Sequence, residues 1–327
     1  KPCCSDIQVK RLQVTKNKSL RIVNGQFRDT PVEALLLEAN TVSMATHMHR
    51  AAMKSTEKAM RMPADHPRRT TWERSMDSRN CRKSWHTECT RTLRTFPIEF
   101  SNRLSFEFFK HPPWNTVQVE AHPDLPGVAG RNDDEAIKRS CAIRRLDDLG
   151  ASVTIYTDGS ADAGFRRGGS AAIVTRGSAE EPVVMETMRR KGAALTSSYE
   201  EEVQAMEDAV SWIVENGEDG QRIVVATDSQ SLCSALRFGG EEVAGLCCKL
   251  QRCSAEVVIQ WIPGHSDIPG NELVDLHAKQ AARMEGDGRP ISYKSACATI
   301  NRLVHDPPTS HPRVAKVYEK FSAEKEK

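Results

Sequence analysis

Short apolar runs, separated by polar turns, begin at about residue 152 and continue through the second half of the chain. The runs 152–161, 168–177 and 181–192 are divided by glycine-bearing turns, which predicts a strand followed by two hairpin partners. Residues 221–230 and 256–265 predict two more strands. The first of these, "QRIVVATDSQ", is continuously apolar at its centre, as in strands that are buried on both faces.

Helical periodicity is clearest over residues 197–217. Ser197 or Ser198 is expected to cap this helix, and Asn216-Gly217 is expected to end it. Its apolar face comprises Val203, Met206, Val210 and Ile213. Further helices are predicted at 229–238, 241–253 and 270–286. The order β-β-β-α-β-α-α-β-α predicts a mixed α/β sheet with helices packed against it.

The first 150 residues have a different pattern. Residues 10–60 predict helices, one of them with Thr30 as its N-cap and Pro31 at its first position. Residues 61–150 are rich in arginine, serine, threonine and proline, and predict a basic, poorly ordered linker with some helical turns. At the other end, residues 289–327 predict a polar tail with one helix at 295–304.

Charge divides the chain in the same way. Residues 1–150 contain 26 Lys and Arg against 18 Asp and Glu, whereas the remainder contains 20 against 26. A basic half beside an acidic half suggests a segment that faces a polyanion, joined to a segment that uses carboxylates. Ordinary solvated surface would explain the charge alone equally well.

Cysteine usage and hydropathy restrict the class of protein. The ten cysteines are scattered without a CxxC pair, which is typical of reduced thiols inside a cell and does not distinguish nucleus from cytoplasm. An apolar run of about 18 residues is missing, so no membrane span is expected. Because the sequence starts at Lys1, we expect a fragment of a longer polypeptide.

Four acidic residues lie at the ends of predicted elements. Asp158 closes the apolar run of the first strand, and Asp228 ends the central strand. Glu202 lies early in the long helix, and Asp275 lies in the last helix. If the two strands are parallel neighbours, both aspartates emerge at one sheet edge. Each acid alone is explained by a turn, a cap or a solvated face, but four converging carboxylates require a cation. Ligands that are all oxygen favour Mg²⁺ or Mn²⁺ over zinc.

Four motifs then point to a family: "YTDGSA", "SSYEEEVQAMEDAV", "VVATDSQS" and "IQWIPGHSDIPGNELVDLHAKQAA". Together they resemble the ribonuclease H domain over residues 151–288, most densely the version in non-LTR (LINE-type) retrotransposon reverse transcriptase polyproteins. The resemblance implies an α/β fold, the ribonuclease H-like mixed five-stranded sheet of order 3-2-1-4-5 flanked by helices. Residues 1–60 resemble the thumb or connection segment of ingi-like and jockey-like elements, and no YxDD polymerase motif accompanies them.

The resemblance also assigns roles to residues. Asp158, Glu202, Asp228 and Asp275 are the implied ligands of two Mg²⁺ or Mn²⁺ ions, with Glu200 and Glu201 as competing registers for Glu202. His265 matches a loop histidine that assists proton transfer or product release. Contacts to an RNA–DNA hybrid are implied for Gly159, Ser160, Ser198, Ser229 and Gln230.

The implied activity is endonucleolytic hydrolysis of the RNA strand of RNA–DNA hybrids. Two divalent ions would supply the hydroxide and stabilise the leaving 3′ oxygen. The expected partners are the hybrid and the rest of a reverse transcriptase polyprotein, with no membrane. Two alternatives stay open: an inactive domain of this fold that only binds or tethers nucleic acid, and another nuclease on the same fold.

Two features of the linker carry weaker hypotheses. Cys81, His86 and Cys89 in "CRKSWHTEC" are possible zinc ligands, but no second ligand pair accompanies them. The arginine-rich run 61–94, with Trp72 and Trp85, is suited to contact nucleic acid and equally suited to be an exposed linker.

Overall fold

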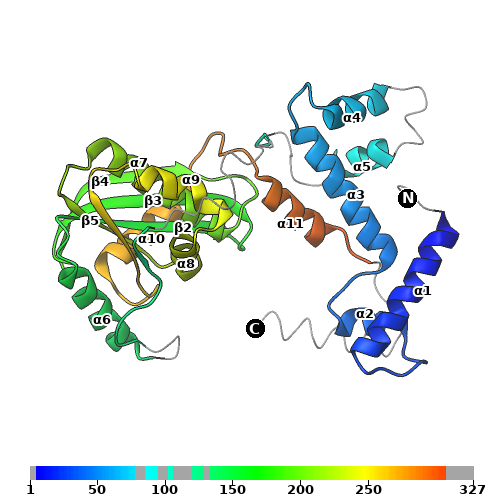
Figure 1. Ribbon diagram of the computed structural model, residues 1–327, viewed down its shortest axis with the longest axis horizontal. Helices are drawn as coiled ribbons and strands as arrows, with labels where there is room; N and C mark the ends of the chain where they lie inside the picture. The colour runs from blue at the N-terminus through cyan, green and yellow to red at the C-terminus, as the bar shows by residue number, and fades with distance from the viewer. Residues whose placement is uncertain (1–4, 78–84, 95–101, 106–118, 129–132, 307–327) are drawn as a thin grey trace. The chain divides into compact units, whose positions relative to one another are not determined.

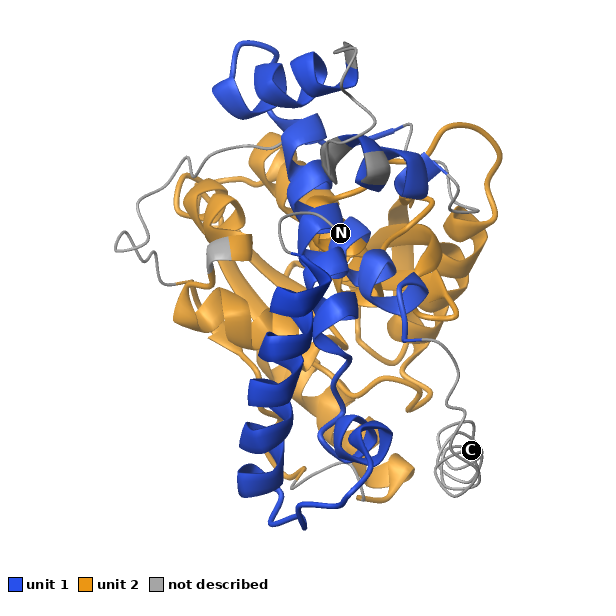
Figure 2. Cartoon of the chain, turned by 90° about the vertical axis from the view of Figure 1, so that its right-hand side faces the viewer, with its two compact units in different colours: residues 1–106, 296–327 blue, residues 107–295 orange. Residues whose placement is uncertain are grey.

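The computed structural model describes residues 5–77, 85–94, 102–105, 119–128 and 133–306. The chain divides into two compact units, residues 1–106 with 296–327 and residues 107–295 (Figure 2). Within the described residues, no helix is both long and apolar enough to cross a membrane.

The second unit is built on a six-stranded mixed sheet of order β1-β6-β5-β2-β3-β4 (Figure 1). The strands are β1 (Ala121–His122), β2 (Val153–Asp162), β3 (Arg166–Gly177), β4 (Pro182–Lys191), β5 (Arg222–Thr227) and β6 (Glu256–Trp261). β2, β3 and β4 form an antiparallel meander, while β5 lies parallel to both β2 and β6. Without β1, this is the predicted five-stranded order, so the predicted fold class is confirmed.

Helices cover both faces of this sheet. One face packs against α7 (Ser198–Asn216), α8 (Gln230–Phe238) and α9 (Ala244–Leu250), with a short 3-10 helix, Glu241–Val243, between α8 and α9. The other face packs against α6 (Glu135–Asp148) and α10 (Pro269–Ala282). Because β2 and β5 lie at the centre with apolar side chains on both faces, their carboxyl ends are held rigidly.

Part of the predicted linker belongs to this unit. We predicted residues 61–150 to be poorly ordered, but β1 adds a parallel edge strand to β6, and α6 buries Ala142 and Leu146 against the sheet. The side chain of Gln260, fully buried on β6, connects both parts of this segment to the sheet through hydrogen bonds. Its amide donates to Asp124 O at 3.1 Å, and its oxygen accepts from Arg145 Nε at 2.8 Å. The high polarity of the segment concealed these contacts.

The first unit is helical. Its elements are α1 (Asp6–Val23), α2 (Val32–Glu38), α3 (Met44–Arg61), α4 (Pro67–Asp77) and α5 (Trp85–Arg94), with α3 packing against α1, α4 and α5. We predicted Thr30 as a cap, but Pro31 occupies the N-cap of α2 and makes no side-chain cap hydrogen bond. The predicted C-terminal helix is present as α11 (Tyr293–Leu303), and Asp306 beyond it accepts hydrogen bonds from Ser43 and Thr46 at the start of α3.

Candidate metal centre

Two aspartates lie side by side on the central strands: Asp158 is within β2, paired with Ala171 of β3, and Asp228 directly follows β5. Thr157 of β2 pairs in parallel with Thr227 of β5, so the next residues, Asp158 and Asp228, lie at the same edge of the sheet. Asp158 is 7% exposed and Asp228 is partly exposed. The carbonyl of Asp228 accepts a hydrogen bond from Trp261 Nε1 at 3.1 Å, which fixes the turn after β5. The strand order alone therefore brings these two carboxylates together.

Helix α7 brings the third carboxylate. Ser197 caps the helix in a capping box with Glu200, as predicted for one of the two serines. The first turn lies against Gly159, where a Cβ would come within 2.2 Å of Glu202 N. This close approach orients Glu202 toward Asp158, and both residues are 7% exposed.

The structure also distinguishes the three glutamates that could have been the ligand on α7. Glu200 belongs to the capping box, and Glu201 forms an ion pair with Arg289, with Nη2 and Oε1 2.6 Å apart. Glu202 alone of the three joins the aspartates. Asp158, Glu202 and Asp228 each offer a carboxylate oxygen, and these atoms lie within 4.8 Å of one another.

Burial and mutual repulsion disfavour ionisation of this cluster. Burial, followed by the charges of Asp228 and Asp275, raises the pKa of Asp158 to about 7. Burial and the charge of Asp158 raise the pKa of Glu202 well above its usual value, and burial is also the main cause of the raised pKa of Asp228. Three carboxylates that are costly to ionise together are stabilised by an added cation.

Asp275 lies at the margin of this cluster. Its charge raises the pKa of both Asp158 and Asp228, so it is close enough to act on them. However, it is not among the three residues that converge within 4.8 Å, and its Oδ2 accepts from Lys279 Nζ at 2.5 Å. Sequence reasoning missed Lys279, although the i,i+4 spacing on a predicted helix was a readable signal.

The loop between β6 and α10 places His265 beside Asp228. A Cβ at Gly264 would lie 2.7 Å from Asp228 Oδ2, and the charge of His265 offsets part of the rise that burial causes in the pKa of Asp228. His265 is exposed and has a φ of 51°, which is uncommon for a residue with a side chain. The predicted loop histidine thus lies next to the carboxylates.

The predicted substrate-contacting residues lie on three elements, β2, α7 and α8. Gly159 and Ser160 follow Asp158 on β2, and Ser229 is the N-cap of α8. Ser198 lies at the start of α7 and is not fully buried. Gln230 is exposed, but one of its amide hydrogens is donated to Pro123 O at 3.0 Å.

The donor set fits a hard divalent cation. Glu202 Oε2 is buried, and no described residue offers it a hydrogen bond. Carboxylate oxygens are the ligands that Mg²⁺ and Mn²⁺ prefer. Asp158, Glu202 and Asp228 could therefore hold such an ion, and Asp275 could join them once Lys279 is displaced.

The two weaker hypotheses about the linker have different outcomes. Cys81 lies outside the described residues, so the zinc site stays a prediction. Cys89 is buried in α5. The indole of Trp72 donates to Thr90 Oγ1 at 3.1 Å and lies under Arg69. This tryptophan therefore joins α4 to α5.

Comparisons with known proteins find a family match for the second unit. The family model for RNase H matches residues 150–283, and a search of curated proteins finds no match. Three similar solved structures are LC11 RNase H1 with an RNA/DNA hybrid, RNase H1 of Halobacterium salinarum, and a foamy viral protease–reverse transcriptase with double-stranded DNA. The LC11 enzyme is 18% identical to this chain, and the match covers 39% of this chain and 98% of the LC11 chain, with a TM-score of 0.33. For the Halobacterium enzyme the identity is 16%, the coverage 40% and 97%, and the TM-score 0.32. For the foamy viral protein the identity is 15%, the coverage 41% and 96%, and the TM-score 0.33.

The family match covers strands β2 to β6 of the sheet and the carboxylate cluster, and leaves out β1. It begins three residues before β2 and ends one residue after α10, so it contains all four predicted ligands and His265. Residues 150–283 thus match the RNase H family and have the mixed α/β fold of an RNase H-like domain.

Proposed function

We propose that this chain is an endoribonuclease that hydrolyses the RNA strand of RNA–DNA hybrids with divalent metal ions. The observation that carries the proposal is the convergence of Asp158, Glu202 and Asp228 within 4.8 Å, inside the region that matches the RNase H family. Without a cation, a buried group of acids would destabilise the fold, because no opposite charge would offset their desolvation and mutual repulsion.

Each residue has a role that follows from its position. Asp158, Glu202 and Asp228 hold the metal ions, with two Mg²⁺ or Mn²⁺ expected, and Asp275 completes the set. Ions bound by these carboxylates would activate a water molecule and offset the negative charge that develops on the leaving 3′ oxygen. His265, exposed beside Asp228, is placed to move a proton or to help release the product.

Recognition of the hybrid is assigned to small polar groups around the cluster. Ser160, Ser198 and Ser229 have small side chains, and their hydroxyl groups can pair with the 2′-hydroxyls that distinguish RNA from DNA. Gly159 is proposed to make a backbone contact with the hybrid. Gln230 retains its oxygen and one amide hydrogen for such a contact, since the other hydrogen is donated to Pro123 O. Because residues 151–327 are net acidic, the basic residues 1–150 are proposed to add phosphate contacts.

The wider context of the chain is also part of the proposal. We infer that the chain comes from a LINE-type retrotransposon reverse transcriptase polyprotein, with residues 1–60 as its thumb or connection segment. The motifs quoted above support this origin.

A cleavage assay tests the activity. The chain is incubated with labelled RNA–DNA hybrid, duplex RNA and duplex DNA in Mg²⁺, beside Asp158→Asn and Asp228→Asn. We expect cleavage of the hybrid alone, with 5′-phosphate and 3′-hydroxyl products, and its loss in both variants. Asp162→Asn is the matched control, because Asp162 lies on the same strand and its side chain is half-exposed in a pair with Arg167.

Two results would contradict the proposal. The first is an intact hybrid after incubation with the parent chain, and the second is equal cleavage by the parent and both variants. Binding of the hybrid without cleavage would instead support a nucleic-acid-binding or tethering segment.

A further inference from the structure

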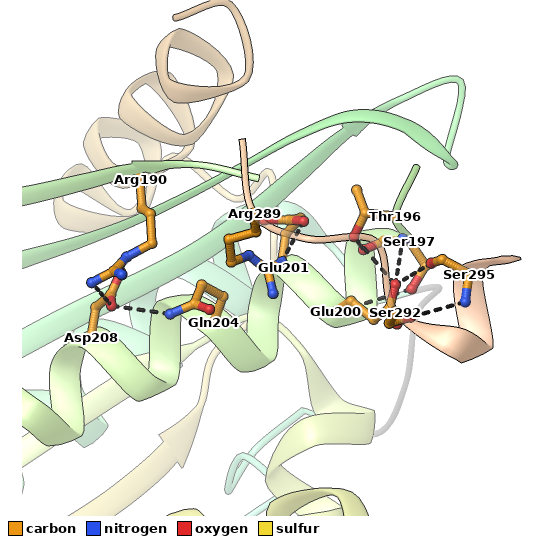
Figure 3. A network of polar contacts seen from close by, with 10 residues as sticks. All are labelled: Arg190, Thr196, Ser197, Glu200, Glu201, Gln204, Asp208, Arg289, Ser292 and Ser295. Carbon is orange, nitrogen blue, oxygen red and sulfur yellow. Dashed lines mark hydrogen bonds and ion pairs between the residues drawn. The ribbon is translucent and has the colours of Figure 1, made fainter. Parts of the chain in front are cut away.

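Three consecutive glutamates at the start of α7 have three separate sets of partners. Glu202 faces the aspartates, while Glu200 accepts hydrogen bonds from Ser292 and Ser295 as well as from the helix cap (Figure 3). Glu201 is fully buried and pairs with Arg289 at 2.6 Å. The two residues before the candidate ligand are therefore both bound by one C-terminal segment.

Glycines enclose the Glu201 carboxylate. A Cβ at Gly168 would come within 2.4 Å of Glu201 Oε1, and a Cβ at Gly192 would come within 2.4 Å of Glu201 Oε2. A carboxylate placed this tightly and fully buried requires a compensating cation. Arg289 supplies that charge, and its own side chain is 27% exposed.

The segment that carries Arg289 is held closely to the same place. We name residues 286–295 the strap. Lys191 donates to the carbonyl of Gly286, and a Cβ at Gly288 would lie 2.0 Å from Gly192 O. Ser292 and Ser295 then continue the strap along the first turn of α7, and all these residues lie in the second compact unit.

We propose that Arg289 is a positioning residue for the candidate metal centre, acting through Glu201. By pairing with Glu201, it fixes the first turn of α7 against Gly159, so that the next residue, Glu202, presents its carboxylate to the metal ions. This inference rests on the proposed function only in assigning Glu202 as a ligand. Loss of Arg289 would leave Glu201 as a buried charge without its partner, and the turn that carries Glu202 would shift to relieve it.

Helix α7 offers a matched control. Arg190 pairs with Asp208 at 2.9 Å, and Asp208 is 7% exposed and lies seven residues, or about two helical turns, beyond Glu201 (Figure 3). This pair has the same chemistry on the same helix but is remote from Glu202. A general loss of helix packing would affect both variants, whereas positioning of Glu202 is specific to Arg289.

The experiment measures metal binding directly. Mn²⁺ is titrated by calorimetry into the full chain without substrate, for the parent, Arg289→Gln and Arg190→Gln, after circular dichroism has verified that each is folded. We expect Arg289→Gln to weaken Mn²⁺ binding by about 10- to 100-fold, as is usual for residues that orient a metal ligand. Arg190→Gln should bind Mn²⁺ as the parent does, and Arg289→Lys should recover part of the loss because it retains the charge.

Cleavage of the hybrid gives a second readout. In Arg289→Gln, the Mg²⁺ concentration for half-maximal rate should rise by about 10- to 100-fold. The KM for the hybrid should be unchanged, because the strap carries none of the proposed substrate contacts. Should Arg289→Gln fail to fold, Glu201→Gln breaks the same pair without burying a lone charge, and it is also expected to weaken Mn²⁺ binding.

The outcomes distinguish this inference from the proposed function. Parent-like Mn²⁺ affinity in Arg289→Gln or in folded Glu201→Gln would overturn the positioning role, as would equal losses in Arg289→Gln and Arg190→Gln. A parent that binds Mn²⁺ but leaves the hybrid intact would overturn the proposed function alone. A parent that binds no Mn²⁺ would overturn both.

Discussion

Glu202 lies so close to Gly159 that a Cβ at position 159 would come within 2.2 Å of the Glu202 backbone nitrogen. Real Cβ contacts are not this short, so any side chain at position 159 must push β2 and α7 apart. The absence of a side chain at one strand position is therefore a condition for the carboxylate cluster. The glycine of the "DG" dipeptide, which in the sequence looks like part of a turn, therefore allows α7 to approach β2.

The first prediction is that Gly159→Ala displaces Glu202. We expect a loss of hybrid cleavage of about 100-fold, because a shift of about 1 Å at a catalytic group has this effect. Overpacking should also lower the free energy of unfolding by about 1–3 kcal/mol. Rates with Mg²⁺ and urea unfolding measure the two effects.

A second glycine provides the control for this substitution. Gly245 lies exposed in α9, and a Cβ added there would meet no other atom within 4 Å. Gly245→Ala should leave cleavage unchanged and should raise the free energy of unfolding slightly, since alanine favours a helix by about 0.5–1 kcal/mol. Parent-like cleavage by Gly159→Ala would show that Glu202 is not held through this contact.

The second prediction concerns pH and the metal-free protein. The pKa of Asp158 is about 7 in the folded chain, whereas in the unfolded chain it is about 4. Between these values the folded state binds more protons, so the free energy of unfolding contributed by Asp158 falls as pH rises from about 4 to about 7. Asp158→Asn removes this penalty and should be more stable than the parent at about pH 8, by on the order of 1–3 kcal/mol.

Urea unfolding with a chelator tests this at low and high pH. The advantage of Asp158→Asn should shrink as the pH approaches about 4, and Mg²⁺ should stabilise the parent more than the variant. Asp162→Asn should show neither effect, because its side chain is half-exposed. An advantage that is independent of pH would mean that Asp158 is not the group that titrates.

The sequence allowed the sheet and the cluster to be predicted because both depend on local signals. The apolar runs set the strands, and the parallel pairing of β2 with β5 then brings Asp158 and Asp228 to one edge. The register of the glutamates needed tertiary contacts: Glu201 is distinguished from Glu202 by Arg289, 88 residues away. Likewise, β1 has only two residues, and polar α6 is recognisable only through the sheet face that it covers.

The third prediction tests this missed segment through Gln260. Its side chain is fully buried and bonds to Asp124 O and to Arg145. Gln260→Leu would leave these groups without a partner, so the free energy of unfolding should fall by about 1–3 kcal/mol. Thermal and urea unfolding measure this loss of stability.

Gln251→Leu, at an exposed position, is the control and should change the free energy of unfolding by less than about 0.5 kcal/mol. Equal effects of Gln260→Leu and Gln251→Leu would show that β1 and α6 add no stability to the unit.

The fourth prediction concerns His265, which lies exposed beside Asp228. If His265 moves a proton or helps to release the product, its loss slows cleavage without removing a metal ligand. His265→Ala should therefore reduce the rate of hybrid cleavage by about 100-fold and leave Mn²⁺ binding close to that of the parent. His277→Ala on α10 is the control, with rates and calorimetry as the two measurements. Parent-like cleavage by His265→Ala, or a large loss of Mn²⁺ affinity, would refute this role.

The fifth prediction concerns Lys279, which pairs with Asp275 and is 52% exposed. A metal ion that uses Asp275 must displace this lysine. Half-exposed pairs contribute about 0.2–1 kcal/mol, so Lys279→Gln should tighten Mn²⁺ binding by no more than about 5-fold. The gain in affinity should diminish at about 1 M salt, where charges are screened within about 3 Å.

Calorimetry at low and high salt measures the Mn²⁺ affinity, with Lys249→Gln at an exposed position as the control. Weaker Mn²⁺ binding in Lys279→Gln would mean that the lysine supports the acidic cluster and does not compete with the metal.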